Sequence, residues 1–299
     1  MALTYVLITA ARNEEAFIEK TIESVITQTV LPKKWVIVSD GSTDRTDQIV
    51  QAYANERDWI ELIRMPERKE RHFGGKAHAF NVGWESVEDL KYDFIGNLDA
   101  DVSFGEDLFG YLLDKCERDP QLGVVGTDYI EDTFHSSKDS YINVHHVNGQ
   151  CQLFRRKCFE DIGGYVPIKE GGIDWVAVTT ARMKGWETYS FPDRTYIHHR
   201  KMGTGNSNLL KSRFHYGKKD YFCGTHPVWQ ICRVAFQMTK RPYVIGGLFL
   251  LSGYFWAWVA NTERPVTKEL MNFHRKEQMK RLRQLFFDKL NFDRRRPSI

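Results

Sequence analysis

Residues 94–101 read Phe-Ile-Gly-Asn-Leu-Asp-Ala-Asp, an apolar strand-like run that ends in two carboxylates one residue apart. Asp99 and Asp101 stand directly after the strand, where both side chains can turn toward one hard cation. Proteins typically hold magnesium or manganese with one or two carboxylates together with substrate phosphates. An Asp-x-Asp pair is common after strands, so its meaning depends on the elements around it.

Strand-like runs alternate with helical patterns on both sides of this stretch. The other strand-like runs cover residues 5–9, 35–39, 60–63 and 122–125. Apolar residues at helical spacing follow an expected N-cap at Asn13, follow Asp44, follow Gly75, and extend over about 106–118. This alternation predicts an α/β fold with a mostly parallel central sheet. Ligands of such sheets bind at the carboxyl ends of strands, near a switch in strand order.

Asp40 ends the second run, just before the tight turn Gly41–Asp44. An acidic residue in this position can accept hydrogen bonds from a nucleobase or ribose. The competing interpretation is that Asp40 and Asp44 cap the turn and the next helix.

Together these motifs resemble inverting family 2 glycosyltransferases of the GT-A fold, of the bacterial or archaeal polysaccharide and glycolipid type. The matching stretches are Thr9–Glu15, Asp40–Asp44, Gly74–Gly83, Leu98–Asp101, Asn148–Arg156 and Ile162–Tyr165, which cover roughly residues 3–200. The resemblance implies a GT-A catalytic domain that moves a sugar from a nucleotide-diphosphate donor to a hydroxyl of a glycan or lipid-linked acceptor. Uridine diphosphate is the first choice for the donor nucleotide.

The resemblance also implies a nucleoside pocket. Asp40 is expected at the nucleobase, with Thr9, Ala11 and Glu14 lining the same pocket.

At the diphosphate, the resemblance implies that Asp101 binds Mn²⁺ or Mg²⁺ directly and that Asp99 faces both ribose and metal. Lys76 is expected near the diphosphate. A solvated lysine is the competing interpretation, although a helix start is an unfavourable place for a cation.

The general base is placed by counting back from the family-like end of a helix, Arg182–Trp186. The count reaches Asp174, while Ile173 stands where the family usually has Glu. One carboxylate suffices to deprotonate an acceptor hydroxyl. An N-cap role for Asp174 competes with this assignment, and Glu170 is a nearby substitute.

Paired histidines and a cation follow another short strand, at His198, His199 and Arg200. Alternation along a strand sends one histidine inward, and we expect His198 to complete the metal site. Arg200 suits phosphate because its guanidinium binds bidentately. A solvated basic loop is the competing interpretation.

The composition is that of a folded protein without a global preference for anionic polymers. The 299 residues carry a net charge of only +3, so nucleic acid is not an expected partner. The five cysteines include no Cys-x-x-Cys pair and are expected to be reduced thiols of a cytosolic protein. No basic leader precedes the first strand, so no signal peptide is expected.

We expect a catalytic domain over residues 1–205, with a nucleotide-binding half at 1–127 and an acceptor half at 128–205, followed by a helical extension at 206–299. Residues 243–260 carry no charge, are rich in aromatics, and lie between Lys240-Arg241 and Arg264. With the basic tail, they predict an interfacial or membrane-dipping hairpin at the cytoplasmic face of a membrane, as a peripheral or monotopic contact. A hairpin buried against the catalytic domain or a second subunit, as in a homodimer, is the competing interpretation.

Two other classes of protein stay open. A sugar nucleotidyltransferase also uses a carboxylate-bound metal, but it normally has a Gly-rich basic loop where this chain has Ala10–Glu15. A non-catalytic GT-A-like scaffold has no reason to combine Asp99, Asp101 and Asp174.

Overall fold

The computed structural model describes residues 3–67, 74–136, 143–169, 171–200 and 209–294, with side chains as far as Leu285. The chain forms two compact units, Met1–Lys201 and Met202–Ile299. The predicted boundary after residue 205 and the alternative base Glu170 both lie outside the described residues. That boundary therefore stays a prediction.

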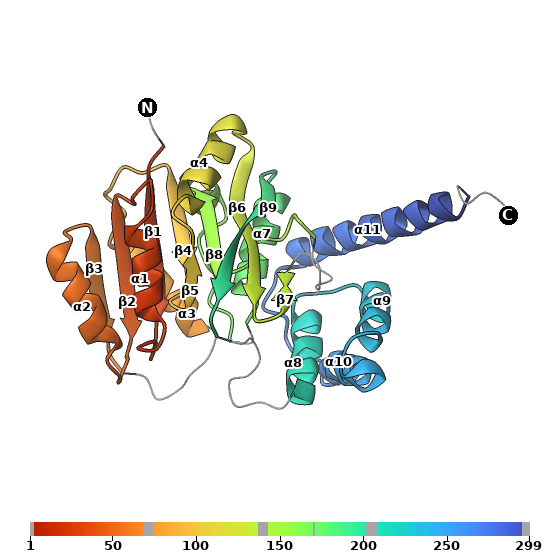
Figure 1. Cartoon of the computed structure of the whole chain (residues 1–299). Coiled ribbons are helices and arrows are strands. Elements are labelled where there is room, and N and C mark those ends of the chain that lie inside the picture. Colours follow the sequence, from red (N-terminus) through yellow and green to blue (C-terminus); the bar gives the residue numbers. More distant parts are fainter. Residues whose placement is uncertain (1–2, 68–73, 137–142, 170, 201–208, 295–299) are drawn as a thin grey trace. The chain divides into compact units, whose positions relative to one another are not determined.

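One mixed sheet runs through the first unit (Figure 1). Its order is β3 (Ile60–Met65), β2 (Lys34–Asp40), β1 (Tyr5–Ala11), β4 (Phe94–Leu98), β8 (Cys151–Arg155), β6 (Leu122–Glu131), β9 (Glu187–His198) and β5 (Val102–Phe104), with β7 (Phe134–His135) beside β6. The first four strands are parallel, and β8 is antiparallel to both β4 and β6. The predicted α/β class is confirmed.

Helices cover both faces of the parallel part. The helices of this unit are α1 (Ile18–Ile26), α2 (Thr46–Glu56), α3 (Gly74–Glu85), α4 (Leu108–Arg118), α6 (Arg156–Asp161) and α7 (Ile173–Met183). Leu7 joins one buried cluster with Ile18 and Ile22 of α1, whereas Ile8 lies against Gly83 of α3 on the other face. These fully buried side chains each contribute roughly 1.5–3 kcal/mol to folding. Burial on both faces explains the continuous apolar runs of these strands.

The predicted N-cap at Asn13 is wrong. Helix α1 begins at Ile18, and Asn13 adopts a left-handed backbone conformation with φ 56°. Its Oδ1 accepts a hydrogen bond from the backbone N of Thr43 at 2.8 Å. The loop after β1 is therefore tied to the loop after β2, which brings the carboxyl ends of these strands together.

A switch in strand order positions the site. From β1, the chain passes to β2 on one side of the sheet, and β4 later pairs with β1 on the other side. Ala11, Asp40 and Leu98 end these three strands at the same edge of the sheet. Crevices at such an edge are where open α/β sheets bind ligands.

The second unit is helical, with α8 (Leu209–Phe222), α9 (Pro227–Met238), α10 (Tyr243–Val259) and α11 (Lys268–Arg294). Two glycines let α8 and α10 approach closely. A Cβ on Gly217 would lie 2.0 Å from the Leu250 carbonyl oxygen, and one on Gly253 equally close to that of Phe214. Only glycine permits this backbone contact, because any side chain would collide with the facing carbonyl.

Residues 243–259 form one continuous helix, so the hairpin predicted within this stretch is wrong, whereas its contact with a membrane stays a prediction. None of the helices in the described part of the chain combines the length and apolar character that crossing a membrane requires.

Candidate active site

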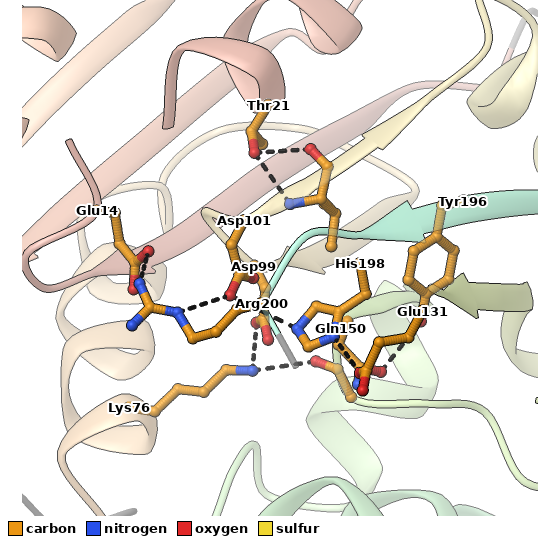
Figure 2. A network of polar contacts seen from close by, with 12 residues as sticks. Glu14, Thr21, Lys76, Asp99, Asp101, Glu131, Gln150, Tyr196, His198 and Arg200 are labelled. Carbon is orange, nitrogen blue, oxygen red and sulfur yellow. Dashed lines mark hydrogen bonds and ion pairs between the residues drawn. The ribbon is translucent and has the colours of Figure 1, made fainter. Parts of the chain in front are cut away.

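The site begins with the two carboxylates that follow β4 (Figure 2). The backbone N of Asp99 donates to the carbonyl of Gln150 at 2.8 Å, which fixes the turn after the strand. The Asp101 side chain is buried and meets two groups from the end of β9. Its Oδ2 lies 3.5 Å from Nε2 of His198 and 3.3 Å from Nε of Arg200. The predicted site residues Asp99, Asp101, His198 and Arg200 therefore lie together.

The two carboxylates differ in their tendency to ionise. Burial raises the pKa of Asp99 above its usual value, and the Asp101 charge adds to this rise while the Lys76 ammonium opposes it. Burial also acts on Asp101, but the hydrogen bond and charge of His198, together with Arg200, lower its pKa. Asp101 is thus the carboxylate held more firmly in its charged form.

The paired histidines point to different partners. His198 is 7% exposed, and its Nδ1 lies 2.9 Å from Oε2 of Glu131 at the end of β6. His199 instead places Nε2 2.8 Å from the hydroxyl of Ser103 and stacks on Phe17. Because successive side chains of a strand alternate in direction, only His198 faces the carboxylates.

Arg200 links Asp101 to the loop after β1. Its guanidinium pairs with the carboxylate of Glu14 as well as with Asp101. Burial and the Asp101 charge raise the pKa of Glu14 to about 7, although Arg200 opposes the shift. Glu14 thus lies beside Arg200 and close to Asp101, the residues predicted for the diphosphate and the metal, and its place in the nucleoside pocket stays a prediction.

Lys76 reaches the site from the first turn of α3. Its Nζ pairs with the Asp99 carboxylate and donates to the carbonyl of Gly149 at 3.1 Å. The same carbonyl accepts from Nδ2 of Asn97 at 2.5 Å. These contacts explain a cation at an otherwise unfavourable helix start, since Asp99 balances its charge.

Asp174 lies on the other side of Gly149, in the first turn of α7 after Gly172, which has φ 92°. A Cβ placed on Gly149 would lie 2.7 Å from Cβ and 3.0 Å from Oδ2 of Asp174. The predicted base therefore packs against the residue whose carbonyl holds Lys76. The N-cap residue of α7 is Gly172, so Asp174 stands at the second position inside the helix rather than at its cap.

The residues predicted for the nucleoside pocket differ in where their side chains lie. Asp40 is buried at the end of β2, with its Oδ2 3.9 Å from Nη1 of Arg12. Ala11 ends β1 beside it. Thr9 is completely buried, and its hydroxyl accepts from the Trp35 indole at 3.0 Å. The Thr9 side chain therefore has a packing role here, whereas Asp40 and Ala11 lie at the edge where ligands bind.

The donor atoms after β4 suit a divalent cation that also binds phosphate. A carboxylate oxygen of Asp101 and an imidazole nitrogen of His198 lie together, with Asp99 beside them. Carboxylates are ligands of both Mg²⁺ and Mn²⁺, whereas an imidazole nitrogen suits the transition metal Mn²⁺ better than the hard cation Mg²⁺. Within the described residues, no three such side chains are close enough to enclose an ion unaided. Phosphate or water oxygens would complete the coordination, as is usual for magnesium at nucleotides.

Three contributors were not predicted: Glu131, Asn97 and Gly149. Glu131 ends a long apolar strand, which is the same signal that identified Asp40 and Asp99. Gly149 lies in a stretch that matches the family, but its contact with Asp174 depends on the approach of helix α7 to the loop before β8.

We expect the metal-free protein to lose stability as the pH rises from about 5 to about 8. The pKa of Glu14 is raised from 4.5 to about 7 and that of His198 from 6.5 to about 8, so the folded state binds more protons than the unfolded chain in this range. Each contribution is complete below the unfolded pKa and is lost as the pH passes the folded pKa. Thermal unfolding in chelator measures the effect. Glu14→Gln should reduce the loss of stability in the lower half of this pH range. A wild-type stability that rises with pH would contradict the raised pKa values of Glu14 and His198.

Gly149→Ala is expected to lower kcat by about 10²-fold, since a misplacement of about 1 Å can have that effect. The new methyl group would displace Asp174, whereas Asp101 would keep its partners. Initial rates and UDP titration measure the two effects separately. Gly105→Ala is a matched control, because a Cβ there would come no nearer than 3.9 Å to Asp107 Oδ1. Equal losses in both variants would show that the effect is not specific to the site.

Comparison with known proteins shows which family the chain resembles. The family model described as glycosyl transferase family 2 matches residues 6–163. Poly-beta-1,6-N-acetyl-D-glucosamine synthase of Staphylococcus aureus (strain COL) is 31% identical over 123 residues, which cover 41% of this chain and 27% of that protein. The Staphylococcus epidermidis enzyme of the same name is 28% identical over 116 residues, 39% of this chain and 26% of its own length. The matched segment thus spans about a quarter of these relatives.

Solved structures of similar fold cover nearly the whole chain. The mannosyltransferase PcManGT from Pyrobaculum calidifontis, in complex with GDP-Man and Mn²⁺, has a TM-score of 0.61 at 17% identity, covering 88% of this chain and 89% of its own. S. aureus TarS 1–349 in complex with UDP-GlcNAc has a TM-score of 0.56 at 12% identity, covering 91% and 79%. At these identities the likeness concerns the fold and confirms the predicted GT-A architecture. Since the family model also covers more than half of the 299 residues, the chain belongs to glycosyltransferase family 2.

Proposed function

We propose that this protein transfers a sugar from a nucleotide-diphosphate donor to an acceptor hydroxyl, with inversion and with help from a divalent metal. One observation carries the proposal: Asp99, Asp101 and His198 converge after β4, beside the cations Lys76 and Arg200. Such a cluster suits a diphosphate leaving group, whose negative charge grows as the bond to the sugar breaks.

Asp174 is the proposed base. It would take the proton of the acceptor hydroxyl while that oxygen forms a bond to the anomeric carbon. The bond from this carbon to the diphosphate oxygen breaks in the same step, and a single displacement inverts the anomeric centre. Lys76 and Arg200 would stabilise the leaving phosphates, and a metal bound at Asp101, Asp99 and His198 would supply Lewis-acid assistance.

UDP-sugars are the first donors to test. Of the similar proteins, TarS is described in complex with UDP-GlcNAc and the staphylococcal synthases are named for poly-N-acetylglucosamine, while PcManGT is described with GDP-Man. Asp40, proposed to meet the nucleobase, does not by itself distinguish uracil from guanine.

Donor hydrolysis without acceptor tests the reaction class. With Mn²⁺ or Mg²⁺, release of UDP from a UDP-sugar supports the transferase. If added pyrophosphate instead converts the UDP-sugar to UTP and sugar 1-phosphate, the protein is a sugar nucleotidyltransferase. Binding of the donor without turnover would indicate a scaffold. GDP-mannose serves as the comparison donor.

The acceptor is proposed to be a glycan or a lipid-linked glycan at the cytoplasmic face of a membrane, on the evidence of α10. The buried face of α10 consists mainly of small residues packed on α8 and α9. Its other face is apolar and exposed, including Ile245, Leu248, Phe255 and Trp258. Ser252 is the polar residue on that face. Exposed Lys240 and Arg241 precede it, a charge that complements anionic lipid. An aromatic face beside basic residues is typical of helices that lie in a membrane interface.

Replacing Leu248 and Phe255 by Glu is expected to abolish sedimentation with vesicles of phosphatidylglycerol and phosphatidylcholine, because charges at the apolar boundary oppose insertion. The double variant Leu31→Glu, Leu90→Glu changes exposed leucines of the first unit and serves as the control. The alternative outcome has two parts: the wild type does not bind vesicles, and light scattering shows dimers that the substitutions in α10 dissociate. That outcome would assign the exposed face of α10 to a second copy of the chain.

A further inference from the structure

Glu131 contacts the proposed metal ligand His198 from outside the site. Its Oε2 lies 2.9 Å from Nδ1 of His198, while Nε2 of the same ring lies 3.5 Å from Oδ2 of Asp101 (Figure 2). Both side chains of the contact are largely buried, with 7% of His198 and 14% of Glu131 exposed. The imidazole is therefore held between two carboxylates on opposite ring nitrogens.

A register shift between two strands creates this contact. Strands β6 and β9 run parallel, with Thr127 opposite Phe191 but Asp128 opposite Thr195. Residues 192–194 are thus an insertion in β9. Without it, Glu131 would lie opposite Thr195 rather than His198. The bulge carries His198 along the sheet to the level of Glu131, and bulges often re-aim a side chain beside a functional site.

We propose that Glu131 is a positioning residue that orients His198 as a metal ligand. A carboxylate that accepts the Nδ1–H leaves the lone pair of Nε2 free to bind a metal and fixes the plane of the ring. Asp101 and Nε2 of His198, which lie 3.5 Å apart, would then hold the ion together. The inference rests on the proposed metal-dependent function, and Glu131 itself does not touch the ion.

Mn²⁺ affinity in the presence of UDP, measured from the paramagnetic resonance of free Mn²⁺, tests this role without turnover. Glu131→Ala is expected to weaken binding about 10- to 100-fold, the usual effect of losing such an outer contact. Glu131→Gln keeps an oxygen that can accept from Nδ1–H and should retain most of the affinity. Glu61→Ala is the matched control, because Glu61 also lies on a strand and makes a 2.9 Å ion pair, with Lys34.

The decisive variant combines Glu131→Ala with His198→Ala. If Glu131 acts through the imidazole, the double variant binds Mn²⁺ as His198→Ala does alone. A further loss in the double variant would make Glu131 a ligand in its own right and overturn the inference. So would unchanged affinity in Glu131→Ala.

The proposed function fails separately from this inference. If wild-type protein with UDP takes up no Mn²⁺, the metal dependence and the role of Glu131 both fall. If the wild type binds Mn²⁺ and Glu131→Ala binds it equally well, only the inference about Glu131 is lost. Thermal unfolding of Glu131→Ala shows whether a loss of Mn²⁺ binding reflects the missing contact or a protein that does not fold. If Glu131→Ala does not fold, Glu131→Gln tests the contact in its place.

Discussion

Asp101→Asn should reduce kcat/KM by about 10³-fold or more, the largest effect we expect from a single substitution. Metal assistance to a leaving phosphate amounts to several kcal/mol, and each 1.36 kcal/mol is a factor of ten in rate. Asparagine keeps the size of the side chain but loses the charge that pairs with His198 and Arg200. Initial rates over a range of Mn²⁺ concentrations measure the loss.

The variant should also lose the metal dependence of UDP binding. Wild-type affinity for UDP is expected to rise when Mn²⁺ is added, whereas Asp101→Asn should bind UDP with similar weak affinity in either case. Asp107→Asn is a matched control, since Asp107 makes an exposed ion pair with Arg194 away from the site. Full activity of Asp101→Asn at saturating Mn²⁺ would contradict its assignment as a metal ligand.

Asp174→Asn is expected to lower kcat by about 10²- to 10⁴-fold, the range for losing a general base. Asparagine fits the same space against Gly149 but cannot take a proton from the acceptor. Since Lys76 and Asp99 pair with each other while Asp174 packs against Gly149, donor affinity should change little. In Asp174→Asn, kcat should therefore fall while donor affinity stays nearly constant. In Asp101→Asn, by contrast, both kcat and donor affinity should change.

For Asp174→Asn, calorimetry of UDP binding in the presence of Mn²⁺ measures donor affinity, and acceptor-dependent turnover measures kcat. Asp161→Asn offers a control on another helix of the same unit, where Asp161 accepts from the Trp186 indole. An intact fold with lost donor binding would show that Asp174 belongs to the donor site and is not the base.

The parts of the site that the sequence predicted are those built by neighbours in the chain. Asp99 and Asp101 follow β4 directly, Asp40 ends β2, and Asp174 begins α7. Each of these positions depends on where a strand or helix stops. Such ends are marked locally by turn residues and by the change in hydrophobic period.

The expectation for Asn13 failed because a partner distant in the sequence uses its side chain. Its oxygen accepts from the backbone of Thr43, and α1 starts later, after Phe17. A capping signal shows that a side chain can cap a helix. It does not reveal whether another loop will occupy the same oxygen.

By itself, the sequence determined the alternation of strands and helices, the carboxylates at their ends and the uncharged stretch that becomes α10, because hydrophobic period and end signals are local properties. Only the tertiary structure decided that Glu131 meets His198, that Gly149 contacts both Lys76 and Asp174, and that α10 buries its glycines while exposing most of its aromatics. These features depend on a three-residue register shift and on close backbone contacts between distant segments. Packing of the whole chain selects them, since a change of strand register re-aims every side chain beyond it.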